Sequence, residues 1–195
     1  MTHPTRRAFL SGGVALASVT AFPAFALTEQ QASNLVSTMV EEINGVIASG
    51  ISEASMYREF ERIFRKYGDI RVIAANALGV DGRRASDRQK KAFTDAFTGY
   101  ISRKYGKRFR EFIGGRLDVQ SVRAIRRGYD VRSIAYLRGT DPFEVSFHVS
   151  DNNRFYNLFI EGVDMLLTER TEIGAMLDKR RGDIDAMIAD LRTSG

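Results

Sequence analysis

Two apolar segments near the C-terminal end of the chain have the pattern of neighbouring β-strands. Every second residue of 143–149 is apolar, with other residue types between, a period of two that is typical of a strand with one buried face. Residues 155–160 are apolar on both faces except at Asn157, and the turn-forming residues 151–153 predict a hairpin between the segments. A strand that is apolar on both faces must be covered on both sides. We therefore expect helices on one face and either more protein or an apolar ligand on the other.

Two further strands are expected before this hairpin. Residues 117–126 and 129–138 are joined across Arg127-Gly128, and the link to the next strand is also short. Short links between consecutive strands favour antiparallel pairing of neighbours. The sequence thus predicts a four-stranded antiparallel meander.

Helical spacing of apolar residues dominates the rest of the chain, with apolar positions three and four residues apart in six segments. These segments are 29–47, 53–67, 69–78, 87–112, 171–176 and 184–191. Gly79 is a suitable C-cap for the third segment, and Ser86 with Gln89 forms a capping-box pattern before the fourth. Helices first, a sheet second and a helical end define an α+β fold.

The first 26 residues have the features of an export signal. Arg6-Arg7 precedes an apolar segment, 12–22, and residues 24–26 form a small-x-small cleavage pattern before Leu27. The apolar segment is too short to span a bilayer. The arginine pair resembles a twin-arginine export signal, and an ordinary Sec signal that contains two arginines is the alternative.

We therefore divide the chain into a signal peptide, residues 1–26, and a single domain, residues 27–195. The domain has about 169 residues, enough to bury a full core. Removal of the signal lowers the net charge from +5 to about +3. No later segment is apolar over a membrane-spanning length, so we expect the mature protein to be soluble and to lie in the periplasm.

Composition excludes several kinds of site. The chain has no cysteine and two histidines, His3 and His148. Disulfides and thiolate catalysis are therefore excluded, and so is a zinc site of the usual kind. We expect no metal and no cofactor.

Three groups of polar residues have both a chemical and a structural interpretation. The acids within 161–172 would suit a carboxylate pair, but helix-end acids explain them equally well. His148 alternates with Phe147 and Val149, so it should point away from the core, and no nucleophile-elbow sequence accompanies it. The basic residues of 103–110 alternate with aromatic residues, which is compatible with nucleic acid. In an exported protein a solvated face, or a surface for anionic lipid headgroups or an acidic partner, is favoured. We predict no nucleic-acid binding and no enzyme activity.

Several short motifs occur together in a specific order. The first half of the chain contains Ala77-Leu78-Gly79, Arg83-x-Ala85-Ser86, Gln89, Phe93, Phe97 and Tyr105. The second half contains Tyr156, Ile160-Glu161-Gly162-Val163, Arg170, Gly182-x-Ile184-Asp185, Ile188 and Leu191. Over residues 30–191 this order and spacing resemble the MlaC, or toluene-tolerance auxiliary, family.

The resemblance implies a fold and a function. The fold would have N-terminal helices packed on a strongly curved four-stranded sheet, NTF2-like in general layout, with a C-terminal helix. The function would be that of a periplasmic phospholipid carrier associated with an ABC transporter, with bound phospholipid as cargo. Its partners would be an inner-membrane ABC transporter complex with a membrane-anchored lipid-binding subunit, and an outer-membrane lipid donor or acceptor.

The chain also departs from the family pattern. The departures are at Gly82, Asn153, Asn157 and Asp164. They leave open whether the cargo is a phospholipid or a related lipid such as a hopanoid.

The candidate lipid-binding residues are apolar positions on the predicted strands and on the long helix. They are Phe93, Phe97, Ile101, Val131, Val145, Phe147, Val149, Tyr156, Leu158 and Ile160. We hypothesise that the strand residues and the helix residues face each other across a pocket. An ordinary packed core is the alternative for these positions, and an exported enzyme or a protein-binding module is the alternative for the function.

The export signal gives a first testable prediction. Replacing both Arg6 and Arg7 by Lys should leave the precursor in the cytoplasm, because the twin-arginine receptor distinguishes guanidinium from ammonium groups. Cell fractionation and immunoblotting measure the outcome. Normal export of the double variant would favour the Sec signal instead.

Overall fold

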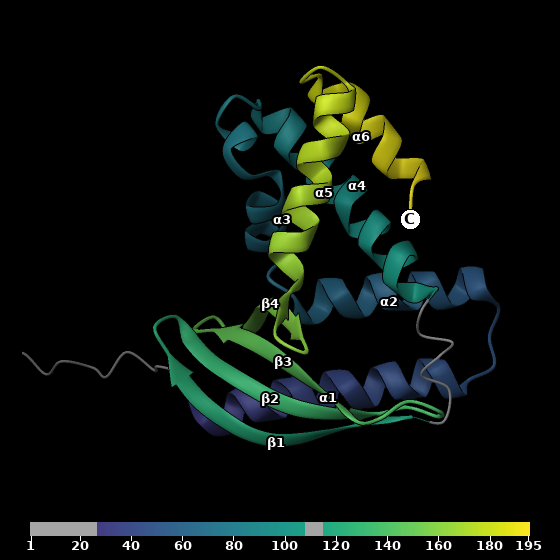
Figure 1. The fold of residues 1–195 in the computed structure, drawn as a ribbon, viewed down its shortest axis with the longest axis vertical. Helices are drawn as coiled ribbons and strands as arrows, with labels where there is room; N and C mark the ends of the chain where they lie inside the picture. Colours follow the sequence, from purple (N-terminus) through teal and green to yellow (C-terminus); the bar gives the residue numbers. More distant parts are fainter. Residues whose placement is uncertain (1–26, 108–114) are drawn as a thin grey trace, which may run out of the picture.

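The computed structural model describes residues 27–107 and 115–195, so the predicted signal lies outside the described residues. The helices are α1 (Glu29–Ala48), α2 (Glu53–Tyr67), α3 (Ile70–Leu78), α4 (Asp87–Gly106), α5 (Met165–Lys179) and α6 (Ile184–Thr193), with a 3₁₀ helix η1 (Gly79–Arg83). The strands are β1 (Arg116–Ile125), β2 (Gly128–Tyr136), β3 (Phe143–Ser150), β4 (Arg154–Ile160) and β5 (Val163–Asp164) (Figure 1). The predicted α+β fold is confirmed.

Side-chain caps fix where the helices begin. Ser86 accepts a hydrogen bond from the backbone N–H of Gln89, whose side chain accepts one from the backbone N–H of Ser86, so the predicted capping box is confirmed. Asp164 caps α5 by accepting from the N–H of Leu167 at 2.9 Å. Because of this cap α5 begins at residue 165, and the expected start at 171 is wrong.

The sheet has five strands in the order β1-β2-β3-β4-β5, all antiparallel to their neighbours. The predicted meander is therefore correct for four strands and lacks the fifth. Strand β5 has two residues, too few to show a period of two. It forms because Glu161 and Gly162, both with positive φ, turn the chain back onto β4.

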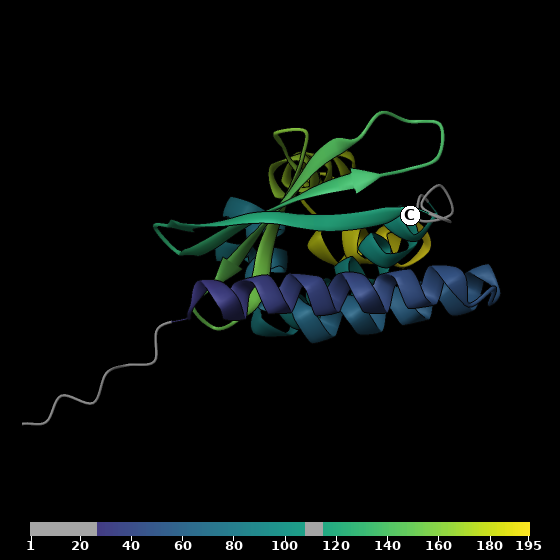
Figure 2. The same cartoon turned by 90° about the horizontal axis from the view of Figure 1, so that it is seen from below.

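Two apolar clusters form the core. In the first, which we call the sheet cluster, the inward side chains of β2 and β3 pack against α1 and α2. In the second, the helical cluster, α3, α4, α5 and α6 pack against one another. Figures 1 and 2 show α1 along the curved sheet with α2 beside it, while the other helices form a block that lies beside β4 and rests on α2 through α4. The molecule thus has a sheet half and a helical half.

The two halves meet along α2 and α4, and also where α2 ends and β4 begins. The N–H of Asp69 donates to the carbonyl of Phe155 at 2.8 Å. Arg154 donates to the last carbonyls of α2, with the closest at Lys66, 2.8 Å away, a favourable place for a cation at a helix C-terminus. The Phe155 ring packs against both clusters. We call these contacts the α2–β4 junction.

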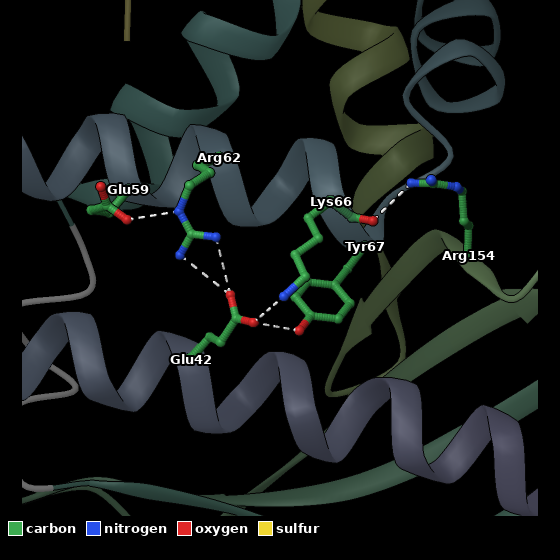
Figure 3. Close-up of polar contacts among 6 residues, drawn as sticks. All are labelled: Glu42, Glu59, Arg62, Lys66, Tyr67 and Arg154. Atoms are coloured by element: carbon green, nitrogen blue, oxygen red, sulfur yellow. Dashed lines mark hydrogen bonds and ion pairs between the residues drawn. The ribbon is translucent and has the colours of Figure 1, made fainter.

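A second group of contacts holds α1 against α2. The carboxylate of Glu42 accepts hydrogen bonds from Arg62, Lys66 and Tyr67, with the Tyr67 hydroxyl 2.6 Å away (Figure 3). These donors, Lys66 first, lower the pKa of Glu42 from 4.5 to about 2. Glu42 therefore stabilises the fold in its ionised form.

Substitution of Glu42 tests this contribution. Glu42→Gln should lower the free energy of unfolding by about 1 kcal/mol at pH 7, because the half-exposed ion pairs around it are screened by water. A carboxylate whose pKa is depressed in the folded state stabilises above its unfolded pKa, and this stabilisation is lost as the pH falls. The difference between parent and variant should shrink from pH 4.5 to about pH 2.

Urea denaturation at a series of pH values measures the difference. Glu59→Gln is the matched control, because the carboxylate of Glu59 is more exposed and binds Arg62. The control should change stability less at pH 7. Equal losses in the two variants, or a difference that persists unchanged at pH 2, would contradict the role assigned to Glu42.

Candidate functional site

A cavity of about 520 Å³ lies where the β1–β2 turn and the β3–β4 turn approach α3 and α5. Its volume is within the range of about 300–1,000 Å³ that is typical of small-molecule sites. It is lined by Asp69, Val72, Asn76, Arg126, Arg127, Ser150, Asp151, Asn152, Tyr156, Asn157, Asp164, Leu166, Leu167 and Arg170. The cavity therefore uses both the sheet half and the helical half of the molecule.

The lining is amphipathic. Val72 and Leu167 are large apolar side chains that remain exposed, at 38% and 60%. Leu166 continues from the cavity into the helical cluster. Tyr156 is next to Phe155, which packs on both clusters. Apolar surface thus leads from the cavity, through Leu166, into the helical cluster.

Most of the predicted strand residues lie together. Val131, Val145, Phe147 and Val149 are buried in the sheet cluster, and Leu158 packs against it. The strand register explains this, because Phe147 pairs with Val131 on one side and Leu158 on the other. Paired residues share a face of the sheet. Ile160 pairs with Val145 and is half-buried.

Tyr156 is an exception. We expected it to share a face with Leu158 and Ile160, and this is wrong. The register shifts by one residue opposite His148 and Val149, and such a bulge reverses the alternation of side chains beyond it. Tyr156 instead lies beside His148, with ring centroids 5.7 Å apart, and lines the cavity.

The predicted helix residues lie elsewhere. Phe93 and Phe97 stack in the helical cluster with ring centroids 5.5 Å apart, and Ile101 packs against the same cluster. The strand residues belong to the sheet cluster. The hypothesis that these two sets face each other across one pocket is therefore wrong. Phe155, which does contact both clusters, was not among the predicted site residues.

The acids that suggested a carboxylate pair have structural partners. Glu169 is 3% exposed and accepts hydrogen bonds from Lys104 and Tyr105. Glu172 binds Lys104 at 2.6 Å, and these contacts raise the pKa of Lys104 although burial opposes the shift. Asp164 caps α5. Glu169 and Glu172 thus join α4 to α5, and Asp164 holds the start of α5, in agreement with the structural interpretation of these acids.

The basic residues of the long helix also have structural partners. Arg103 donates to the carbonyls of Leu191 and Ser194 at the end of α6, and Lys107 donates to the carbonyl of Gly195. The prediction that this helix face is solvated is therefore wrong for Arg103 and Lys104, which are half-buried. Residues 108 and 110 lie outside the described part of the chain.

His148 does not form a triad with the serine on its face. The hydroxyl of Ser146 donates to Asp130, and Arg123 also binds that carboxylate at 3.2 Å. His148 packs between the rings of Tyr156 and Phe159, and burial lowers its pKa. Among residues 27–107 and 115–195 no group of three or more His, Asp or Glu side chains is placed to hold a metal ion. Within these same ranges, no helix has the length and apolar character needed to cross a membrane.

An amphipathic cavity between a curved sheet and a helical block is typical of a protein that binds a small ligand. A model of the MlaC protein family matches residues 34–193. The chain therefore belongs to the MlaC family, and the predicted resemblance is confirmed.

A solved structure supports the same fold. The phospholipid-binding protein from Ralstonia solanacearum, solved in complex with a phospholipid, superposes with a TM-score of 0.69 and 19% sequence identity. The similarity covers 82% of this chain and 98% of that chain. At this identity the comparison establishes a common fold. No match was found among curated proteins.

The sheet cluster gives a testable prediction about the candidate residues. Val145 is 7% exposed, and its neighbour on β2, Ser133, has a buried hydroxyl without a hydrogen-bond partner among the described residues. If acyl chains enter between the sheet and α1, Val145→Trp should occupy their space. Lipid content should fall, while the Tm of the lipid-free protein changes little.

Mass spectrometry of bound lipid and thermal unfolding of the delipidated variant measure the two quantities. In a dry, fully packed core the larger side chain would destabilise by about 1–3 kcal/mol. A large fall in Tm together with unchanged lipid content would remove Val145 from the lipid site.

Proposed function

We propose that this protein is a periplasmic carrier that holds a phospholipid, or a related lipid, and transfers it between membranes. Membership of the MlaC family over residues 34–193 is the observation that carries the proposal. The phospholipid bound to the structural neighbour from Ralstonia solanacearum supports it. The predicted export signal supports the location, and the MlaC family supports a carrier over an enzyme.

The amphipathic lining suits a lipid cargo. Acyl chains would enter the apolar interior beside Phe155, where the sheet cluster and the helical cluster meet. The charged headgroup would stay in the cavity, because burial of an unpaired charge is costly. Binding would be a partition equilibrium without a covalent step.

The energetics of acyl burial require direct transfer. Each buried methylene contributes about 0.8 kcal/mol, so two chains of about fifteen methylenes gain on the order of 20 kcal/mol relative to water. This is near the limit for non-covalent binding. Release into water would then be too slow for a carrier, so unloading requires contact with a membrane or another lipid-binding protein.

The partners follow from the proposed family role. We propose an inner-membrane ABC transporter complex with a membrane-anchored lipid-binding subunit, and an outer-membrane protein that donates or accepts the lipid. In both encounters the acyl chains would pass between two apolar sites. The direction of transfer would depend on the relative affinities of the donor and acceptor and on ATP use by the transporter.

The carrier function is tested on the mature protein. Residues 27–195 purified from a bacterial periplasm should contain phospholipid by native mass spectrometry and should take labelled phospholipid from vesicles. Leu158→Gln should reduce uptake, because it places an amide on the half-buried apolar face of β4.

Val163→Gln is the matched control, since Val163 is 55% exposed and lies on the neighbouring strand. It should retain uptake. Absence of lipid from the native mass spectra, together with no uptake from vesicles by the parent protein, would refute the carrier function.

A further inference from the structure

Three arginines line the cavity from two directions. Arg126 and Arg127 come from the turn between β1 and β2, and Arg170 comes from α5. No hydrogen bond or ion pair joins any of the three to another side chain in residues 27–107 or 115–195. Some exposed arginines on the helices, such as Arg62 and Arg180, are paired with carboxylates. The cavity therefore contains three guanidinium groups whose hydrogen-bonding capacity is not used by the described side chains.

Arg170 is held in place by close packing. A Cβ atom on residue 79 would lie 2.8 Å from the Nε atom of Arg170, so Gly79 leaves the room that the guanidinium occupies. Gly79 also has a φ of +62°, which disfavours other residues there. Two positions that the sequence motifs singled out thus meet beside the cavity.

Three acids share the lining with these arginines, and two of them have other hydrogen-bond partners. Asp69 accepts from the N–H of Val72, and Asp164 accepts from the N–H of Leu167 and from the side chain of Asn157. Both carboxylates thus serve as helix caps. Asp151, in the hairpin turn, is the third acid of the lining. The lining thus carries three guanidinium groups and three carboxylates; two of the carboxylates are engaged as helix caps, whereas the guanidinium groups have no side-chain partner among the described residues.

We propose that Arg126, Arg127 and Arg170 bind the phosphate of the lipid headgroup, so that the cavity selects lipids that carry a phosphate. This inference rests on the proposed carrier function. Guanidinium groups bind phosphate oxygens through paired, charge-assisted hydrogen bonds. The apolar side chains of Val72, Leu166 and Leu167 in the same lining favour an amphiphile over a free anion.

The test compares two lipids with the same acyl chains, a phospholipid and a diacylglycerol without phosphate. The delipidated mature protein is incubated with neutral vesicles that contain both, and the bound lipids are quantified by mass spectrometry. The parent should prefer the phospholipid by about tenfold or more, because a charge-assisted hydrogen bond contributes about one decade of affinity.

A triple variant, Arg126→Gln, Arg127→Gln and Arg170→Gln, should lose this preference and still take up diacylglycerol. The matched control is Arg138→Gln, Arg181→Gln and Arg192→Gln. It removes the same charge from exposed positions outside the cavity lining, and should keep the preference. A preference retained by the first variant, or lost equally in both, would overturn the assignment.

Three further outcomes separate headgroup selection from the carrier function and from a site for a free anion. Equal uptake of both lipids by the parent would overturn headgroup selection and leave the carrier function intact. Uptake of neither lipid would refute the carrier function and the headgroup site together. Titration with inorganic phosphate, followed by ³¹P NMR, should show weak binding at most; tight binding that is lost in the Arg126, Arg127 and Arg170 variant, with no lipid preference, would assign the site to a free anion.

Discussion

The fold depends on the close approach of a helix end to a strand at the α2–β4 junction. An added Cβ on Gly68 would lie 2.8 Å from the carbonyl oxygen of Phe64 and 3.2 Å from the ring of Phe155. This approach allows Asp69 to bond the backbone of Phe155, and it places that ring against both apolar clusters. Arg154, the residue before Phe155 in β4, donates to carbonyls at the same helix end. Together with the packing of α4 on α2, these contacts hold the sheet half against the helical half, and their relative position sets the shape of the cavity.

The position of the cavity follows from this geometry. The two strand turns lie at the end of the sheet that approaches α3 and α5 (Figure 1). Polar turn residues and helix caps meet there, while Leu166 and Phe155 connect the same place to apolar interior. A site with charge at its surface and apolar contacts beneath suits an amphiphile. The proposed carrier function requires no catalytic group, because the affinity would come from burial of the acyl chains.

Parts of the candidate site were predictable from local patterns. The alternation in 143–149 correctly placed Val145, Phe147 and Val149 on the buried face of β3. The same reasoning failed for Tyr156, because one extra residue opposite His148 reverses the faces. It also failed for Phe93 and Phe97, whose helical spacing shows that one face is buried but does not show against which element. In the sequence, Arg126 and Arg127 could be recognised only as two adjacent cations in the short link between two predicted strands. Such a pair has no function until a second element is placed beside it.

The sequence by itself determined the α+β order of elements, the capping box at Ser86, the first four strands of the meander and the family resemblance. These features depend on residues close together in the chain, where periodicity and turn chemistry act directly. Tertiary structure alone decided the separation into two clusters, the approach of Gly68 to Phe155, and the meeting of Arg126 and Arg127 with Arg170 in one cavity. Those contacts join residues more than forty positions apart. Many arrangements bury the same apolar faces, and packing between specific side chains selects one of them.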